Sequence, residues 1–287
     1  MREEPIIMDK NKVILACAMT GAQTPKQKNA AVPVTPEEIA DDVYKVWKAG
    51  ATICHLHMRD DKWNGTMDRD RFAETVRLIR AHEDCDIIIN CTSSGENNAS
   101  DDRRLEHFKT VPGIEIGSYD VGTFLWGGAG TFYNTPDFLK KAAAVYDEKG
   151  IKPECEIFDM GMLSNVKWLI KNGFVKTPMY CQLVLGVVGG MDATVENLIY
   201  LVKHLPEGTY WSAAGIGTAH LPIMYAALAM GGHIRVGLED NLYMSRGVKA
   251  TNVSLVERAV AAIHEYGKEP ATPTEAREAL GLKPLVR

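Results

Sequence analysis

The sequence lacks the features that mark several large classes of protein. It has no block of lysines and arginines, and 32 basic against 37 acidic residues give the 287-residue chain a formal net charge of −5. Binding to nucleic acid needs clustered positive charge that releases counterions from the phosphates. No apolar run reaches the roughly 18 residues of a membrane-spanning helix, and the N-terminus lacks the apolar core of a signal peptide. We therefore expect neither nucleic acid nor a membrane as a partner.

Cysteine pairs of the C-x-x-C type are also missing. The six cysteines are Cys17, Cys54, Cys85, Cys91, Cys155 and Cys181. All but one lie within apolar runs, where a reduced thiol behaves as a small hydrophobic side chain. Because none has an evident activating neighbour, the pattern favours inert core thiols over redox or nucleophilic roles. The expected location is the reducing cytoplasm.

Eight segments rich in β-branched and apolar residues alternate with segments of helical periodicity. The expected strands span residues 13–21, 52–60, 87–95, 114–122, 153–161, 179–187, 209–217 and 233–241. This alternation is typical of a parallel sheet with crossover helices. Eight strand–helix pairs predict an α/β fold, the (β/α)8 TIM barrel. A doubly wound open sheet is the alternative, but it usually has fewer strands, and no G-x-G-x-x-G follows the first strand.

The first expected helix has clear start and stop signals. Thr35 occupies the capping position, Pro36 the first helical position, Glu38 completes a capping box, and Gly50 follows the last turn. Similar amphipathic stretches follow most of the other strands. The sequence therefore specifies both layers of the predicted barrel.

No linker, repeat or low-complexity tract divides the chain. We expect one domain over residues 1–287, with a C-terminal extension at about 267–287. That extension contains a short capped helix near Pro273, which we expect to pack on the outside of the barrel. The segment 123–134 is apolar and carries a tryptophan, so it is a candidate interface loop, lid or core segment.

The active site of a TIM barrel lies at the C-terminal ends of its strands. His55 and His57 close the second strand, and a period of two sends both imidazoles to one face, as a divalent metal requires. Glu239 and Asp240 follow the eighth strand and offer the missing carboxylate ligand. Two histidines and one carboxylate suit Zn²⁺, with Mn²⁺ or Fe²⁺ as alternatives. A hydrogen-bonded histidine pair and two acids at a helix N-terminus would be the purely structural explanations.

Charged residues inside other expected strands are harder to explain structurally. Arg235 lies in an apolar strand, where an unpaired charge costs several kcal/mol, so it needs a carboxylate or an anionic ligand. Glu154 and Glu156 are two acids on one face of the fifth strand. The third and fourth strands end in hydroxyl and acidic groups that are ordinary caps by default but also suit a small oxygenated substrate. These groups include Thr92, Ser118 and Asp120.

Several longer motifs run along the chain, namely T-G-A near the first strand, A-V-P-x-T-x-E-E-I-A at 31–40, H-L-H-x-R at 55–59, P-E-x-E-x-F-D-x-G-M at 153–162, L-G-V-x-G-G-M at 185–191, A-G-I-G at 214–217 and G-G-H-I-R-V-G-L-E-D-N at 231–241. Together these motifs are similar to those of the β-keto acid cleavage enzymes, a zinc-dependent (β/α)8 family. The resemblance runs nearly from end to end. It implies that a β-keto acid and acetyl-CoA become acetoacetate and a shortened acyl-CoA.

The resemblance also implies roles for individual residues. It makes His55, His57 and Glu239 the zinc ligands, Asp240 the base and Arg235 its charged partner. A further set falls where the family contacts its substrate or carries its strand-five acid, namely Thr92, Gly95, Ser118 and Glu156. It further suggests a homotetramer. Nothing in the sequence indicates where CoA binds.

Two positions bear on the substrate. Gln23 stands where the aminohexanoate-cleaving members of the family carry a glutamate that meets the substrate ammonium. A neutral amide cannot supply that charge, so we expect 3-keto-5-aminohexanoate not to be the preferred substrate. Asp120 stands where those members have an uncharged residue, and it offers another place for a cation.

Two other functions remain open at this point. A metal-dependent hydrolase or aldolase would use the same His/His/Glu centre without acetyl-CoA. A non-catalytic zinc-binding barrel would keep His55 and His57 but would have no need of Arg235 or Asp240.

Overall fold

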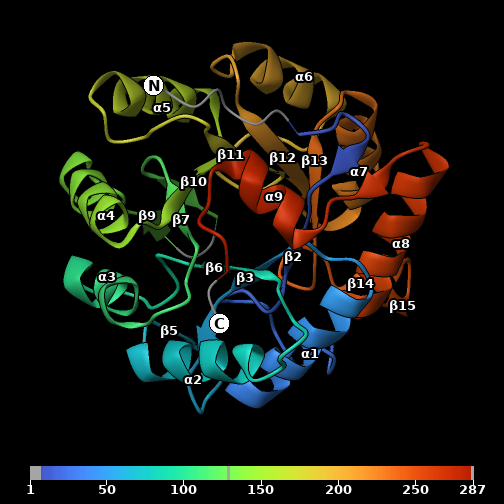
Figure 1. Cartoon of the computed structure of the whole chain (residues 1–287), viewed down its shortest axis with the longest axis horizontal. Coiled ribbons are helices and arrows are strands. Elements are labelled where there is room, and N and C mark those ends of the chain that lie inside the picture. The colour runs from blue at the N-terminus through green and yellow to red at the C-terminus, as the bar shows by residue number, and fades with distance from the viewer. Residues whose placement is uncertain (1–7, 128–129, 286–287) are drawn as a thin grey trace.

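The computed structural model describes residues 8–127 and 130–285, and within them eight parallel strands close into a barrel in chain order (Figure 1). The strands are β2 Leu15–Ala18, β3 Ile53–Leu56, β6 Ile88–Cys91, β7 Ile116–Asp120, β10 Lys152–Ile157, β11 Tyr180–Leu185, β12 Tyr210–Gly215 and β13 His233–Val236. Each strand overlaps the range predicted for it. The prediction of a (β/α)8 barrel is confirmed.

Helices surround the barrel (Figure 1). They are α1 Pro36–Lys48, α2 Arg69–Arg80, α3 Asp101–Thr110, α4 Pro136–Lys149, α5 Met160–Lys171, α6 Val195–His204, α7 His220–Ala229 and α8 Asn252–Glu265, with a short 3₁₀ turn at Gly217–Ala219 and a further helix α9 Pro273–Leu280. The capping box predicted at Thr35 and Glu38 is present at the start of α1. The prediction from local signals is therefore confirmed where those signals were strongest.

In the described part of the chain, three antiparallel hairpins follow the carboxyl ends of barrel strands. They are β4 Met58–Arg59 with β5 Gly65–Thr66, β8 Phe124–Trp126 with β9 Gly130–Phe132, and β14 Tyr243–Ser245 with β15 Val248–Lys249. At the other end, β1 Lys12–Val13 pairs with β16 Glu269–Pro270. The hairpins lie at the end of the barrel where the predicted site residues lie, and the β8–β9 hairpin contributes to the wall of the cavity there.

The C-terminal helix α9 does not pack on the outside of the barrel, so that expectation is wrong. Ala276 and Leu280 are buried against side chains near the N-terminal ends of the strands, including those of Ile53, Ile88 and Ile116. Figure 1 shows α9 lying across the middle of the strand ring. The apolar side chains at this end of the strands would otherwise contact water, and α9 buries them.

Ion pairs hold α9 in place. The Arg277 guanidinium donates to Glu115, with Nε to Oε2 at 2.6 Å, and Glu115 also receives a bond from Arg80 at 2.8 Å. Arg277 also donates to the carbonyl of Asp86 at 2.7 Å. The carboxylate of Glu115 therefore joins α9 to α2 at the closed end of the barrel.

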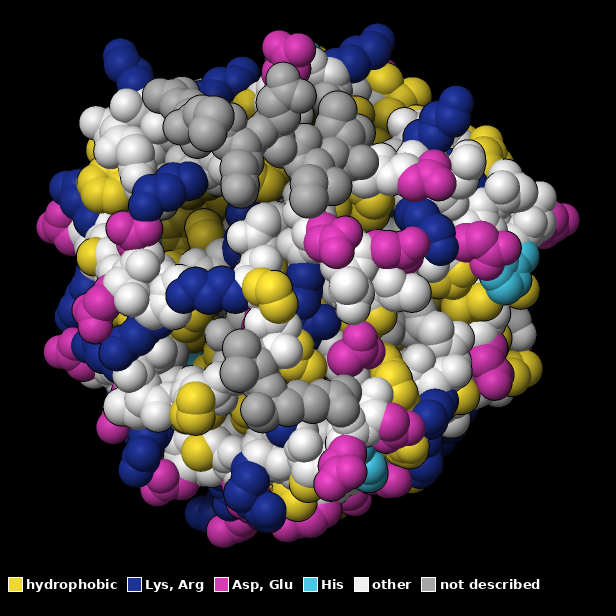
Figure 2. Space-filling model, in the orientation of Figure 1, with side chains coloured by type: hydrophobic (Ala, Val, Ile, Leu, Met, Phe, Trp, Pro, Cys, Tyr) yellow, Lys and Arg dark blue, Asp and Glu magenta, His cyan; other side chains and the backbone are white. Residues whose placement is uncertain are grey.

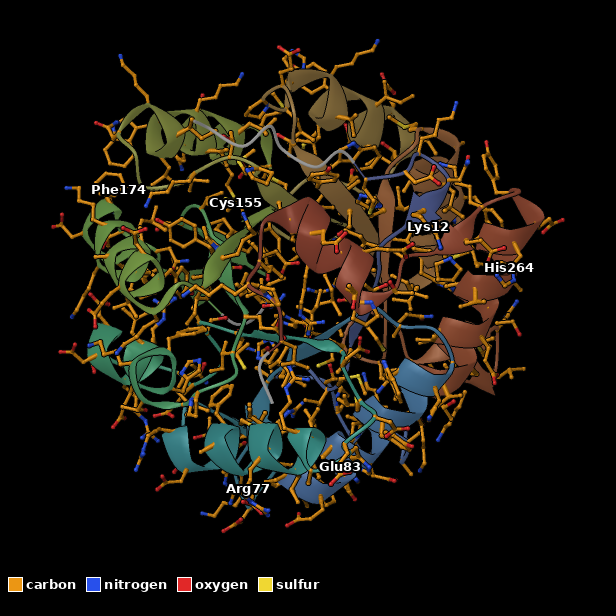
Figure 3. All side chains as sticks on the ribbon, in the orientation of Figure 1. Lys12, Arg77, Glu83, Cys155, Phe174 and His264 are labelled. Atoms are coloured by element: carbon orange, nitrogen blue, oxygen red, sulfur yellow. The ribbon has the colours of Figure 1, made fainter. Side chains whose placement is uncertain are left out.

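The surface and the thiols agree with the composition. On the face shown in Figure 2, acidic and basic side chains are interspersed without a large field of one sign. All six cysteines are free and buried; Cys155, labelled in Figure 3, lies inside the ring of helices, whereas Arg77 and Glu83 lie at its periphery. Among the described residues, no helix has the length and apolar character needed to cross a bilayer.

Candidate active site

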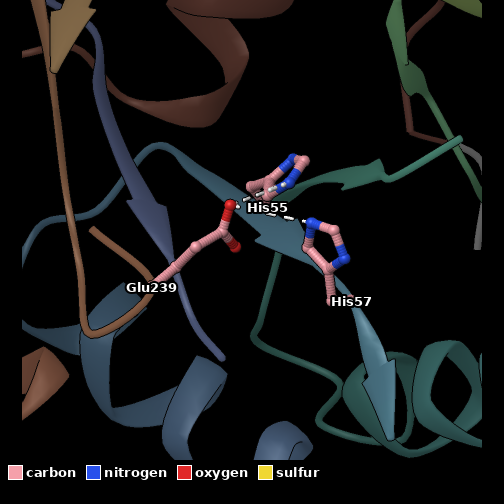
Figure 4. A group of neighbouring side chains, drawn as sticks. All are labelled: His55, His57 and Glu239. Atoms are coloured by element: carbon pink, nitrogen blue, oxygen red, sulfur yellow. Dashed lines mark ion pairs between the residues drawn. The ribbon is translucent and has the colours of Figure 1, made fainter. Parts of the chain in front are cut away.

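Two histidines and one glutamate converge at the carboxyl end of the barrel (Figure 4). His55 belongs to β3, His57 follows it directly, and Glu239 lies in the loop after β13. The Nε2 atoms of His55 and His57 both lie 3.6 Å from Oε1 of Glu239. Ligand atoms of a tetrahedral zinc ion with bonds of about 2.0–2.1 Å lie about 3.3 Å apart. The three side chains are thus close to the spacing of a metal site.

A tight turn brings Glu239 to this position. Gly237 has φ +142°, and a Cβ there would lie 2.1 Å from the carbonyl oxygen of Ala18. Only glycine allows β13 to pass so close to β2. The chain then turns so that the amide of Glu239 donates to Ala18 at 3.2 Å.

The protonation of the group suits a metal ion. Burial lowers the pKa of His55 to about 3 and also lowers the pKa of His57, so both rings are neutral, the form that coordinates metals. Burial opposes ionisation of Glu239, but the charged guanidinium of Arg235, which donates to it at 2.7 Å, keeps its pKa below the usual range. Its Oε2 atom is buried and has no hydrogen-bond partner among the described residues. A neutral nitrogen pair with an ionised, unsatisfied carboxylate fits zinc.

Arg235 and Asp240 form a two-pronged ion pair beside this group. Nε of Arg235 lies 2.9 Å from Oδ2 of Asp240, and Nη2 lies 2.9 Å from Oδ1. Nη2 also donates to Oε1 of Glu239 at 2.7 Å. Burial raises the pKa of Asp240 against the pull of Arg235. Arg235 therefore binds two carboxylates, which meets the need predicted for it. The raised pKa of Asp240 suits a group that takes and returns a proton.

Three further acids line the inside of the barrel. Glu154 and Glu156 lie on β10, and Glu156 is in register with Asp120 on β7. Burial raises the pKa of Glu154 to about 7 and that of Asp120 to about 6, and burial together with Asp120 raises the pKa of Glu156 well above its usual range. Asn90 donates to Glu154 at 2.6 Å, whereas Oδ2 of Asp120 is buried and has no partner among the described residues. All three carboxyl groups therefore have pKa values above those of exposed carboxyl groups.

The loop after β6 carries the predicted hydroxyl groups. The hydroxyl of Thr92 donates to the carbonyl of Ser94 and accepts from its amide, both at 3.0 Å. The amide of Ser93 donates to the hydroxyl of Ser118 on β7 at 3.2 Å. Gly95 packs on His57, since a Cβ there would lie 3.2 Å from Nδ1. The loop is therefore fixed against both the histidine pair and the neighbouring strand.

A cavity of about 850 Å³ connects these groups. The residues given a catalytic, substrate-binding or metal-binding role from the sequence all line it except His55, and Glu154 does not line it either. Sequence reasoning did not find its apolar wall, which consists of Trp126, Phe132, Phe138, Phe158, Val184, Val187 and Ile216. Aromatic and aliphatic residues are common in any barrel, so nothing in the sequence distinguishes these from core residues.

Arg104 was also missed. It lies on α3, lines the cavity, and donates to the carbonyl of Ser93 at 2.7 Å and to the side chain of Asn134 at 2.7 Å. Asn134 in turn donates to the carbonyl of Asp120 at 2.6 Å. An arginine within a polar helix has no distinguishing sequence signal, because such residues are usually solvated.

Comparison with known proteins decides the family. The family model described as beta-keto acid cleavage enzyme matches residues 12–282. The chain belongs to this family. The match covers all eight barrel strands and both segments that carry the His/His/Glu group, so the resemblance seen in the sequence motifs is confirmed.

Characterised relatives act on different compounds. The chain is 41% identical to the 3-keto-5-aminohexanoate cleavage enzyme of Fusobacterium nucleatum, over 95% of this chain and 98% of that protein. It is 33% identical to the 3-dehydrocarnitine:acetyl-CoA trimethylamine transferase of Rhizobium meliloti, over 97% and 99%. It is also 33% identical to the 3-oxoadipate:acetyl-CoA acetyltransferase of Cupriavidus necator, over 94% of each. Family membership makes the protein an enzyme without naming its substrate.

Solved structures agree on the fold. The complex of ObcA with oxaloacetate superposes with a TM-score of 0.80 at 21% identity, covering 88% of this chain and 68% of that one. At that level of identity the likeness shows the barrel architecture alone.

Proposed function

We propose that this enzyme cleaves a β-keto acid with acetyl-CoA, releasing acetoacetate and the acyl-CoA of the remaining fragment, and that it depends on zinc. The observation that carries the proposal is the His55, His57 and Glu239 group directly beside the Arg235–Asp240 pair. Two of the relatives reported above are named for acetyl-CoA-dependent transfers and support the co-substrate. A binding protein would gain nothing from a buried carboxylate poised beside its metal ligands.

The metal would be held by His55, His57 and Glu239, with Mn²⁺ or Fe²⁺ as alternatives to Zn²⁺. When bound, it supplies Lewis acidity to the oxygens of the β-keto acid. The Arg235 guanidinium, which donates to both Glu239 and Asp240, keeps the ligand and the base in a fixed relation. Thr92, Gly95 and Ser118 line the same cavity and would hold the substrate's polar groups.

Asp240 would begin the reaction as a base. It takes a proton from C2 of the β-keto acid, and C2 then forms a bond to the thioester carbonyl of acetyl-CoA as the CoA thiolate leaves. The thiolate adds to the original keto carbon, the bond between that carbon and C2 breaks, and acyl-CoA forms. The acetoacetate carbanion recovers the proton from Asp240, so the enzyme is regenerated. Glu156, whose carboxyl faces the cavity, would donate a hydrogen bond to developing oxygen charge.

The cavity also bears on which β-keto acid fits. Gln23 lines it as a neutral amide on the loop after β2, so an ammonium group at that position would find no opposite charge. We therefore expect 3-keto-5-aminohexanoate to be a poorer substrate than uncharged β-keto acids. Asp120 also lines the cavity, and its Oδ2 atom, which has no partner among the described residues, offers a place for a differently positioned cation.

The deciding experiment combines metal analysis with a panel of substrates. The purified protein is assayed for zinc and then mixed with acetyl-CoA and neutral, anionic and cationic β-keto acids, with acetoacetate and acyl-CoA measured. Near-stoichiometric zinc with both products is the expected result, and the preferred acid identifies the substrate. Zinc with substrate loss that does not need acetyl-CoA would instead indicate a metal-dependent hydrolase or aldolase. A higher kcat/KM for 3-keto-5-aminohexanoate than for neutral acids would overturn the argument from Gln23.

We further propose a cytoplasmic homotetramer. The support for the compartment is the set of six free, buried thiols. The candidate interface at 123–134 folds as the β8–β9 hairpin, with Leu125 and Tyr133 about two-thirds exposed at 66% and 67%. Residues 128 and 129 lie outside the described residues. Sedimentation of the purified protein tests the tetramer.

A further inference from the structure

Arg59 is a buried arginine whose hydrogen bonds all go to backbone carbonyls. Nε donates to Gly21 at 2.5 Å, and Nη2 donates to Thr20 at 3.0 Å and to Thr24 at 2.8 Å. Nη1 donates to Trp63 at 2.7 Å. The side chain belongs to a residue only 3% exposed. One guanidinium thus joins the loop after β2 to the turn between β4 and β5.

This arrangement is unusual for a buried charge. Most buried arginines pair with a carboxylate, since a carbonyl dipole does not neutralise the charge. Among the described residues, Arg59 forms no ion pair; burial lowers its pKa, and the carboxylate of Glu239 is the main influence that opposes the shift. A neutral side chain would serve a purely structural role at lower cost in desolvation. The position of this charge therefore calls for an explanation in the site.

The loop that Arg59 holds is packed directly against a proposed metal ligand. A Cβ on Gly21 would lie 2.7 Å from Cγ of Glu239, so the loop backbone lies against that side chain. The hydroxyl of Thr24 donates to the carbonyl of Glu239 at 3.3 Å. Gln23 lies between Gly21 and Thr24 in the sequence of this loop and lines the cavity. The loop therefore contacts Glu239 at its side chain and at its backbone carbonyl, and it forms part of the cavity.

Arg59 also binds the turn between β4 and β5, whose backbone is strained at Trp63. Trp63 has φ +67°, a left-handed conformation that is rare for a bulky aromatic residue. Such a conformation persists where the surroundings fix it. Its amide donates to Asp60 at 2.9 Å and its carbonyl accepts from Arg59, so both of its backbone polar groups are held.

We propose that Arg59 is a positioning residue for the active site, which fixes the loop at residues 20–24 so that it holds Glu239 in place for the metal and Gln23 in place at the substrate. The inference rests on the proposed function in assigning Glu239 to the metal. His55, His57 and Arg59 are spaced by two in one sequence, so the segment that supplies two ligands also secures the third. Groups behind metal ligands typically alter metal affinity or activity 10- to 100-fold when removed.

The test is substitution of Arg59 by methionine, which keeps the apolar stem and removes all donors, and by lysine, which keeps the charge and some donors. For R59M we expect zinc affinity, measured by competition with a chelator, to fall about 10- to 100-fold. We also expect KM for the β-keto acid to rise more than kcat falls, and trypsin to cleave faster after Lys26 or Lys28. R59K should give intermediate values for all three.

Arg277→Lys is the matched control, since Arg277 is an equally buried arginine at the closed end of the barrel, 4% exposed. It should lower Tm while leaving zinc affinity, KM and cleavage at these lysines unchanged. The proposal is overturned if folded R59M retains the parent zinc affinity and KM, or if R277K alters them to the same extent. Absence of acetyl-CoA-dependent turnover in the parent protein would refute the proposed function, whereas zinc affinity and proteolysis would still decide the role of Arg59.

Discussion

Asp240 is the residue on which the proposed chemistry most directly depends. It is 7% exposed, and the two oxygens of its carboxylate are both held by Arg235. Replacing it with asparagine preserves the shape but removes the group that accepts a proton. We expect D240N to lower kcat by about 100- to 10,000-fold, the usual contribution of a general base. Steady-state kinetics and metal analysis of the same preparation check this.

The zinc content of D240N should equal that of the parent, because Asp240 is not a proposed ligand. A suitable control is Asp137→Asn, which alters an exposed aspartate in the first turn of α4 that does not line the cavity. Its turnover should match the parent. If D240N retained full turnover, Asp240 would not be the base.

His107 provides a prediction about pH and stability. Burial lowers its pKa to about 3, and its ring bonds to the carbonyl of Thr92 at 3.0 Å and stacks on Phe72. The unfolded chain takes up a proton at about pH 6.5 and the folded chain does not. The contribution of His107 to the free energy of unfolding therefore falls by about 1.4 kcal/mol for each unit that the pH drops below 6.5.

Buried Asp120 and Glu154 act in the opposite direction over part of this range, because their pKa values are raised. The effect of His107 is therefore measured as the difference in pH dependence of stability between the parent protein and a variant that lacks this histidine. Urea unfolding between pH 5 and 7.5 should show a shallower acid loss of stability for His107→Gln than for the parent. Equal slopes would contradict it, as would an NMR titration of the His107 ring near pH 6.5.

At the scale of elements, the barrel has one functional end and one structural end. The β8–β9 hairpin and the loops after β2 and β6 line the cavity, whereas α9 fills the other end with apolar side chains. Leu280 of α9 is fully buried. Truncation to alanine should cost about 2–5 kcal/mol, because it leaves a void in a packed cluster.

This loss should appear as a lower urea midpoint for L280A, with kcat and KM at 25 °C unchanged. Val195→Ala is the comparison, since that valine is exposed in α6 and its truncation should change stability by less than about 0.5 kcal/mol. A change of KM in stable L280A would show that the two ends of the barrel are coupled.

The elements themselves were predictable to different degrees. The helix α1 has its cap, first proline and stop within 16 residues of sequence, so local chemistry fixes its ends. The short helix after Pro273 was equally clear, but its place against the strand ends was not, because an amphipathic helix reports only that one face is buried. Which surface buries it depends on the closed barrel.

At the scale of the whole molecule, the barrel brings together ligands that are far apart in sequence. His57 and Glu239 are joined only through the fold, so a metal bound between them should stabilise the folded chain. At a free zinc concentration 100 times Kd the gain is about 2.7 kcal/mol, which should raise Tm by a few degrees. Removal of zinc with a chelator should lower Tm and abolish acetyl-CoA-dependent turnover, and added zinc should restore both.

The response should disappear in His57→Ala, which lacks one of the three ligands. Calorimetry with and without zinc measures it directly. If H57A gained the same Tm increase as the parent, the metal would have to bind elsewhere.

The sequence by itself determined the strand and helix pattern, the histidine pair on one strand, and the acid pair after another, because periodicity and spacing are local properties. It also supplied family motifs that the comparisons confirmed. Only the tertiary structure decided that Arg235 binds Asp240 and Glu239 together, that α9 fills the barrel, and that Arg59 holds the loop at residues 20–24. These contacts join segments that become neighbours only when the barrel closes. The partners of Arg59 are backbone carbonyls, which every residue type supplies, so the sequence does not mark which residues it binds.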